Sequence, residues 1–219
     1  MKNQQQIWND IHTQRKLARY SYSATDFANE VEKIITPNSE ILELGCGLGN
    51  DSTFFAAHGH NVVATDFSEV AIQNNNGKYA AITNVTFTVV DMSVTPYQFE
   101  SNRFDAVYSR FSLHYFSDEV TRKIVTEIHR ILQPNGYFCF MSKSVEDPEY
   151  GKGEKLEENM YVNEGRVRHF FTEEYAKDIL KDVFEIVKIE SKKEDLYGQK
   201  SGYIKVIAKK IENSPHLVQ

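Results

Sequence analysis

Short apolar runs alternate along this chain with longer segments in which apolar side chains recur every three or four residues. The short runs lie at residues 41–44, 61–66, 85–90, 104–109 and 137–141. The longest periodic segment, residues 117–132, places Val120, Ile124 and Ile128 on one helical face. Alternation of strand-length and helix-length patterns predicts βαβ units that build a parallel sheet.

The C-terminal third follows a different pattern. Residues 142–165 are polar, with several glycines and many acids, and predict a surface loop. Two further apolar runs, residues 184–189 and 203–208, are joined without room for a helix and predict an antiparallel hairpin. The count is therefore seven strands, of which the last pair is antiparallel.

Helices are predicted on either side of the first strands. The first forty residues look helical, and the SATD sequence at residues 23–26 resembles a capping box. Pro37 ends this region, because a proline disfavours the α conformation of the residue before it. Ser68 is expected to cap a helix that the NNNG sequence at residues 74–77 makes weak.

Length and composition narrow the possibilities. A chain of 219 residues is suited to a single α/β domain, residues 1–219. The two cysteines, Cys46 and Cys139, lie in apolar segments, and no Cys/His spacing predicts a metal site. A net charge of -6 argues against nucleic acid as a partner. Neither a signal peptide nor a membrane span is visible, so the expected compartment is the cytoplasm.

A glycine-rich turn carries the first chemical signal. Gly45, Gly47 and Gly49 stand between an apolar strand and a helix, where glycine lets the backbone turn sharply and lets a ligand approach it closely. The spacing G-x-G-x-G is one residue shorter than the dinucleotide-binding fingerprint, and no Lys-Ser/Thr follows as in a P-loop. A tight strand-to-helix turn without a ligand would also explain these glycines.

Two acids follow the glycine turn at the ends of strands. Asp66 closes the second predicted strand about 20 residues on, where a carboxylate accepts hydrogen bonds from ribose hydroxyls. Asp91 closes the third strand in the same way. Because the carboxyl ends of parallel strands share one edge, both acids are expected at one crevice. Taken alone, Asp66 also suits a helix cap and Asp91 a turn.

These motifs, taken in order, resemble a known family. The segments ELGCGLG (43–49), VATDFS (63–68), VDM (90–92), FDAVYS (104–109) and LQPNG (132–136) are similar to the ordered motifs of class I S-adenosylmethionine (SAM)-dependent methyltransferases. The resemblance implies a Rossmann-like, three-layer α/β fold with a seven-stranded sheet and an antiparallel last strand. It also implies SAM as the cofactor. Residues 50–51 and 168–171 look most like the tellurite-resistance type of small-molecule methyltransferase.

The resemblance assigns roles at the cofactor site. Gly45, Cys46 and Gly47 would pass under the methionine part and the ribose of SAM. Glu43 would orient this loop or the amino group, and Asp66 would hold the ribose hydroxyls. The remaining assignments are Phe67 and Met92 beside the adenine, Asp91 at its amino group, and Ser109 and Arg110 at the methionine end.

His114 is the candidate general base, because it follows the fourth strand close to where the methyl group should point. A packing or capping histidine is an equal alternative. Arg110 suits an anionic acceptor or an ordinary ion pair. Residues 142–170 would form a lid over the substrate. His169, near the end of this stretch, would close over the site, or it belongs to a solvated basic turn.

The N-terminal residues 1–36 are expected to form a helical cover. Trp8, Arg15 and Tyr20 would then contact the site from this cover, unless the segment only packs on the core. The acidic residues 146–158 would disfavour anionic acceptors, or they form a solvated loop.

The favoured hypothesis is a methyltransferase that acts on a small molecule by in-line transfer. Three alternatives stay open: a nicotinamide-dependent oxidoreductase, a regulatory protein that binds SAM and transfers nothing, and a methyltransferase for nucleic acid or protein. The glycine spacing favours SAM over a nicotinamide. Residues 109–112 read SRFS instead of an (N/D)PPY motif, which disfavours methylation of a base.

Overall fold

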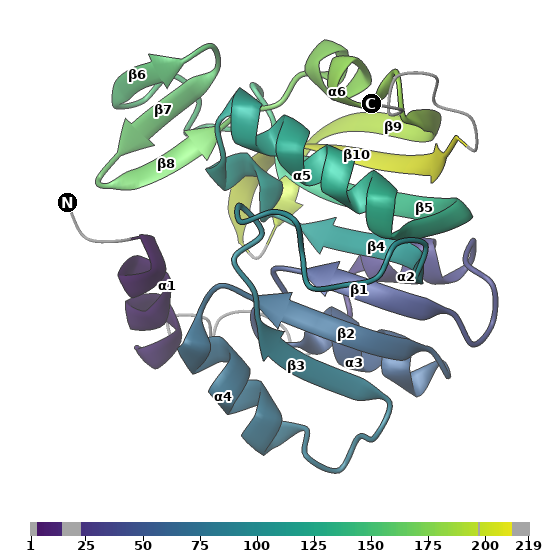
Figure 1. Cartoon of the computed structure of the whole chain (residues 1–219). Helices are drawn as coiled ribbons and strands as arrows, with labels where there is room; N and C mark the ends of the chain where they lie inside the picture. Colours follow the sequence, from purple (N-terminus) through teal and green to yellow (C-terminus); the bar gives the residue numbers. More distant parts are fainter. Residues whose placement is uncertain (1–3, 15–22, 197, 212–219) are drawn as a thin grey trace. The chain divides into compact units, whose positions relative to one another are not determined.

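A computed structural model describes residues 4–14, 23–196 and 198–211, which divide into two compact units, residues 1–92 and 93–219 (Figure 1). The prediction that residues 1–219 form a single domain stays a prediction. Within the described part of the chain, no helix is long and apolar enough to cross a membrane. The cytoplasmic location also stays a prediction.

The first unit is an alternation of strands and helices. Its elements are α1 (Gln4–Thr13), α2 (Asp26–Glu32), β1 (Glu40–Leu44), α3 (Asn50–Ala57), β2 (Asn61–Asp66), α4 (Glu69–Lys78) and β3 (Val85–Val89). The strands are parallel in the order β3-β2-β1, with Leu42 opposite Val63 and Val63 opposite Thr86. Ile41, Leu42 and Leu44 are fully buried, as a continuous apolar run predicts.

The second unit completes the seven strands of the main sheet and adds a smaller one. Its elements are β4 (Phe104–Arg110), the 3₁₀ helix η2 (Leu113–Tyr115), α5 (Asp118–Ile131), β5 (Leu132–Lys143), β6 (Glu154–Glu157), β7 (Met160–Asn163), β8 (Arg166–His169), α6 (Glu173–Leu180), β9 (Phe184–Leu196) and β10 (Gln199–Lys210). Its main-sheet strands run in the order β4-β5-β10-β9, with β10 antiparallel to both neighbours. The predicted fold class is confirmed.

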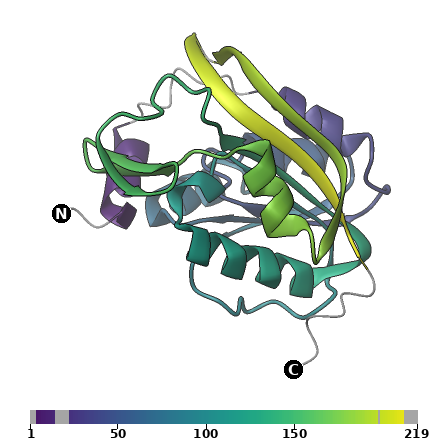
Figure 2. The ribbon, with the colours of Figure 1, turned by 90° about the horizontal axis from the view of Figure 1, so that it is seen from above.

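The C-terminal hairpin is longer than its apolar runs predict. Strands β9 and β10 lie side by side along their whole length, from Phe184 opposite Lys210 to Leu196 opposite Gln199 (Figure 2). The far half of β9 is exposed, so pairing with β10 extends it beyond its hydrophobic pattern. Backbone hydrogen bonds, which carry no hydrophobic signature, set this length.

Residues 142–165 are not a loop throughout, which corrects the prediction from their polarity. They contain β6 and β7, which form an antiparallel sheet with β8 in the order β6-β7-β8. Strand β6 is exposed at every position, so it shows no alternation that could reveal it. The role of this region as a substrate lid stays a prediction.

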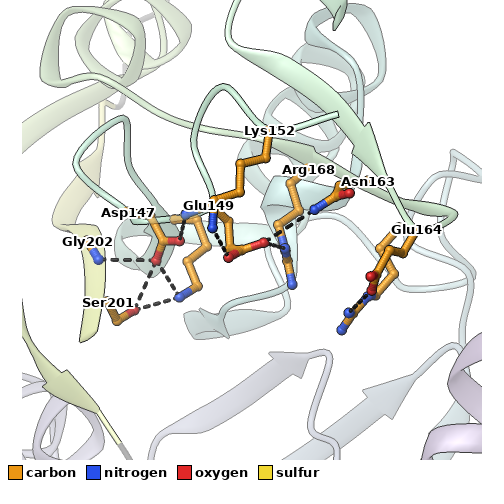
Figure 3. A network of polar contacts seen from close by, with 10 residues as sticks. Asp147, Glu149, Lys152, Asn163, Glu164, Arg168, Ser201 and Gly202 are labelled. Carbon is orange, nitrogen blue, oxygen red and sulfur yellow. Dashed lines mark hydrogen bonds and ion pairs between the residues drawn. The ribbon is translucent and has the colours of Figure 1, made fainter. Parts of the chain in front are cut away.

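The segment between β5 and β6 is held to β10 by contacts of Asp147. The Asp147 carboxylate lies 2.7 Å from the Lys143 ammonium and accepts hydrogen bonds from the Ser201 hydroxyl and the Gly202 N–H (Figure 3). A Cβ on Gly202 would approach the Asp147 nitrogen to 2.2 Å. The chain after β5 therefore closes directly onto β10.

Two predictions about helix ends are also corrected. The cap of α2 is Thr25, whose hydroxyl accepts from the Ala28 N–H, and not Ser23. Helix α2 already ends at Glu32, well before Pro37. Ser68 caps α4 as expected, but that helix runs on through Lys78 despite its asparagines, because Asn75 is buried and used in tertiary contacts.

Candidate active site

The glycine turn has left-handed backbone at all three glycines. Gly45, Gly47 and Gly49 have φ of 82°, 51° and 74°, a region that other residues enter only with strain. The N–H groups of Gly45 and Cys46 both donate to the Thr65 carbonyl of β2, at 2.8 Å each. The turn is therefore tied to the carboxyl end of the neighbouring strand, as the motif predicts.

Two of these glycines are required for different reasons. A Cβ on Gly49 would lie 2.9 Å from the Phe87 ring and 3.1 Å from the Tyr79 ring, so Gly49 serves packing of the first unit. A Cβ on Gly47 would meet nothing closer than the His12 ring at 4.0 Å. At Gly47 the His12 ring lies at ordinary contact distance, so the positive φ and not a clash favours glycine there.

Asp66 is held rigidly at the end of β2. Its Oδ2 accepts the Gly47 N–H at 2.9 Å, and its Oδ1 accepts the Ser68 N–H at 2.8 Å. Each carboxylate oxygen retains a second lone pair, because a carboxylate offers about four acceptor positions. Asp66 can therefore fix the glycine turn and still accept two hydroxyl groups.

Glu43 acts inside the first unit and not at its surface. Its carboxylate is buried and accepts a short hydrogen bond from the Ser52 hydroxyl of α3, while its carbonyl accepts from the Thr65 hydroxyl. These contacts join β1, β2 and the helix that follows the turn. The orienting role expected for Glu43 stays a prediction.

Asn75 is a site residue that the sequence did not reveal. Its amide donates to the Gly47 carbonyl at 2.9 Å and lies 3.8 Å from the Cys46 sulfur. Burial, together with the carboxylates of Asp66 and Glu43, raises the pKa of the Cys46 thiol well above its ordinary value. Cys46 is therefore a packed, neutral thiol.

Helix α1 docks on the turn through three polar residues. The Gln5 amide donates to the Phe67 carbonyl at 3.1 Å, and the Asn9 amide oxygen accepts from the Ser68 hydroxyl at 2.7 Å. His12 is buried next to Gly47, and burial lowers its pKa while the Asp66 carboxylate opposes that shift. His12 was missed because a polar residue in an amphipathic segment gives no signal of its own.

The other predicted contacts in this part of the chain vary in placement. Trp8 lies in α1 with its ring 6.3 Å from His12, whereas Arg15 and Tyr20 lie outside the described residues. Strand β3 ends at Val89, so Asp91 lies two residues beyond the strand that it was expected to close. Phe67 is half-buried, and Met92 is buried.

In the second unit, β4 ends at Arg110 and is followed by a strained residue. Ser109 is fully buried. Phe111 has φ of 54°, which is rare for a bulky side chain, and its N–H donates to the Met141 carbonyl at 2.7 Å. The Arg110 guanidinium lies 4.8 Å from the Phe111 ring centre, and the Lys143 ammonium lies 5.2 Å from it.

His114 lies in η2, buried against aromatic rings. Its ring lies edge-on to Phe111, with centroids 6.0 Å apart, and 4.2 Å from Tyr115. Burial lowers its pKa well below the ordinary histidine value, and the cations of Arg168 and Lys143 lower it further. At neutral pH the imidazole is therefore uncharged and chemically able to accept a proton.

His169 is buried at the end of β8, not in a solvated basic turn. It packs against the rings of Phe171 and Tyr175, with centroids 5.2 Å and 4.6 Å away. Among the described residues, no group of histidines, cysteines and acids could hold a metal ion.

The chain matches known proteins over its central part. Residues 41–136 match the family model described as a methyltransferase domain. Phosphoethanolamine N-methyltransferase 1 of Zea mays is 34% identical over 100 residues, which are 46% of this chain and 20% of that protein. The chain thus spans only about a fifth of the length of that curated relative.

Solved structures extend the likeness to the fold. A SAM-dependent methyltransferase of Methanosarcina mazei matches with a TM-score of 0.73 and 22% identity, covering 83% of this chain and 97% of that one. A 1,6-didemethyltoxoflavin-N1-methyltransferase of Burkholderia thailandensis matches with a TM-score of 0.70 and 21% identity, covering 94% and 88%. The resemblance to class I SAM-dependent methyltransferases is thereby confirmed, and SAM is the cofactor of that class.

Proposed function

We propose that the protein binds SAM at the glycine turn of its first unit and transfers the methyl group to a small molecule. The observation that carries this proposal is the Gly47–Asp66 pair within the segment that matches a methyltransferase domain: the Gly47 N–H donates to a carboxylate that keeps further acceptor positions. A ligand with an extended chain and vicinal hydroxyls suits this arrangement, and SAM has both.

The proposed cofactor contacts follow from these residues. The backbone of Gly45, Cys46 and Gly47 would accommodate the methionine part and the ribose, and Asp66 would accept from the ribose hydroxyls. The adenine would be held by Phe67, Met92 and Asp91. Glu43 would act through the turn, and Ser109 and Arg110 through their backbone at the methionine end. His12 is added to this set because it lies over Gly47.

SAM supplies a methyl group already activated on a positively charged sulfur. What remains for the chain is to align the acceptor, exclude water and remove a proton where the acceptor has one. His114 is the proposed base. Its uncharged state at neutral pH and its unpartnered Nδ1 support this role.

A small molecule is the proposed acceptor. Two similar proteins act on small molecules according to their names, phosphoethanolamine for one and 1,6-didemethyltoxoflavin for the other. We assign neither acceptor to this protein, because the first match covers only a fifth of its relative and the second is a similarity of fold.

Calorimetric titration of the full chain with SAM and, separately, with NADH tests the cofactor. We expect micromolar affinity for SAM and no binding of NADH, and the reverse result would make the protein a nicotinamide enzyme. A screen of small molecules with methyl-labelled SAM then tests transfer. SAM binding without transfer to any of them, amines, acids, phenols and thiols included, would favour the regulatory alternative.

A further inference from the structure

Two buried nitrogen atoms, one on η2 and one on β8, have no hydrogen-bond partner among the described residues, and these two elements contact each other. Nδ1 of His114 and Nε of Arg168 make no hydrogen bond to any described residue. The His114 side chain is 1% exposed. Native proteins rarely leave such atoms unsatisfied, because each costs the free energy of removing a polar group from water. A ligand that both atoms contact would resolve the cost.

The two cations that act on His114 differ in how well they are neutralised. The Lys143 ammonium forms an ion pair with the Asp147 carboxylate at 2.7 Å and donates a hydrogen bond to the Ser201 hydroxyl at 2.6 Å. Among the described residues, the ion pair of Arg168 is a long one, 3.8 Å from its Nη1 to the Glu149 carboxylate. The positive charge of Arg168 is therefore less fully neutralised than that of Lys143, and a second acidic group could pair with it.

Glu149 is itself shared among several donors. It lies 2.8 Å from the Lys152 ammonium and accepts from the Asn163 amide at 3.4 Å, so Arg168 is its most distant partner (Figure 3). The carboxylate engages Nη1 of Arg168 and leaves Nε without an acceptor. Because Nε–H can only donate, the missing partner must be an acceptor, and an anion suits it best.

His169, which is also buried in this region, belongs to a different environment. Burial lowers its pKa, and the Phe116 backbone and the carboxylates of Glu157 and Asp118 oppose that shift only in part. It lines a cavity of about 290 Å³ together with these acids. Three carboxylates, those of Asp118, Glu157 and Glu158, line this cavity against one arginine, Arg122, so it suits an anion poorly.

We infer that the methyl acceptor carries an acidic group, a carboxylate or a phosphate, which Arg168 binds through Nε while His114 contacts the same molecule. This inference rests on the proposed transfer to a small molecule and narrows its acceptor class. Arg168 acts as the specificity-determining residue, and the half-buried Phe111 ring beside His114 offers an apolar surface for the rest of the acceptor.

Side-chain histidine NMR of the SAM-bound protein tests the inference, with inorganic phosphate and acetate as probes. We expect at least one probe to shift the His114 resonances at millimolar concentration and to raise its pKa, while the exposed His58 stays unchanged. Arg168→Gln should weaken probe binding about tenfold, the loss expected for one charge-assisted hydrogen bond. The matched control is Arg166→Gln on the same strand, where the arginine is exposed.

Two results would overturn the inference: no response of His114 to either probe in the wild-type protein, or equal binding by Arg168→Gln and Arg166→Gln. If Arg168→Gln fails to fold, the wild-type titration and Arg168→Lys, which keeps the charge but loses Nε–H, decide the matter. SAM affinity is measured on the same samples. Normal SAM binding with no anion response rejects only this inference, whereas lost SAM binding in the wild type rejects the proposed function.

Discussion

The glycine turn of the first unit and the His114 region of the second are built from opposite charges. Around Gly47 the charged groups are carboxylates, Asp66 and Glu43, and the one imidazole nearby has Asp66 as its neighbour. Around His114 they are the cations Arg168 and Lys143. Burial lowers the pKa of both His12 and His114, but a carboxylate opposes this shift at His12, whereas cations add to it at His114. We therefore expect the two regions to suit ligands of opposite charge.

Removal of the proposed base should separate transfer from cofactor binding most strongly. With an acceptor from the screen, His114→Asn should lower kcat by about a hundredfold or more, because a positioned base contributes about 10²–10⁴ to the rate. The affinity for SAM should stay unchanged. Measured kcat within a few fold of wild type would remove His114 from the mechanism.

Asp66→Ala should act mainly on SAM binding, in contrast to His114→Asn, which should act on kcat. The variant loses acceptors for the ribose and for the Gly47 N–H, so SAM affinity measured by calorimetry should fall about a hundredfold, at 1.5–3 kcal/mol for each bond to a charged group. Glu69→Ala, three residues on in the first turn of α4, is the control. Binding that is indifferent to Asp66 would mean that the cofactor site lies elsewhere.

The two glycines should separate packing from binding. Gly49→Ala should lower the free energy of unfolding in urea by about 2 kcal/mol, because its Cβ enters the Phe87 ring and its φ is 74°. Gly47→Ala has the backbone strain without the clash, so it should be less destabilising but should weaken SAM binding more. Equal effects of both variants on stability and on binding would contradict this division.

Helix α1 should contribute a smaller part of the affinity. His12→Ala removes the buried ring beside Gly47, and we expect about a tenfold loss in SAM affinity, as for one hydrogen bond or one apolar contact of this size. His58→Ala, on an exposed residue, should change nothing. An unchanged affinity in His12→Ala would show that α1 only packs on the first unit.

The smallest expected effect is on stability as a function of pH. The pKa of His114 is lowered in the folded state. As pH falls, His114 is therefore protonated at a higher pH in the unfolded chain than in the folded protein. The free energy of unfolding should therefore be constant above about pH 6.5 and fall below it, by about 1.4 kcal/mol for each unit of pKa difference. His114→Asn should flatten this fall, as measured by urea unfolding between pH 7.5 and 5. An equal slope in the variant would contradict the direction of the shift.

How much could be predicted differs between elements. Strand β2 matches its apolar run from Asn61 to Asp66 residue for residue, because a buried parallel strand has a continuous apolar signature. Strand β6, exposed throughout, has no such signature and was read as loop. Helix α4 was expected to be weak from its asparagines, yet Asn75 is buried and holds the Gly47 carbonyl, a contact from outside the helix.

The candidate site also combines features that the sequence predicted with features that only the structure shows. The sequence by itself determined the glycine turn, the acids that follow it and the count of seven strands, since the φ values of glycine and the apolar runs of buried strands are set by local chemistry. Only the tertiary structure decided that His12 lies over Gly47, that His114 is buried beside cations and that Arg168 lacks a full partner. Those facts depend on which side chains meet across distant elements, and a single sequence does not record such meetings.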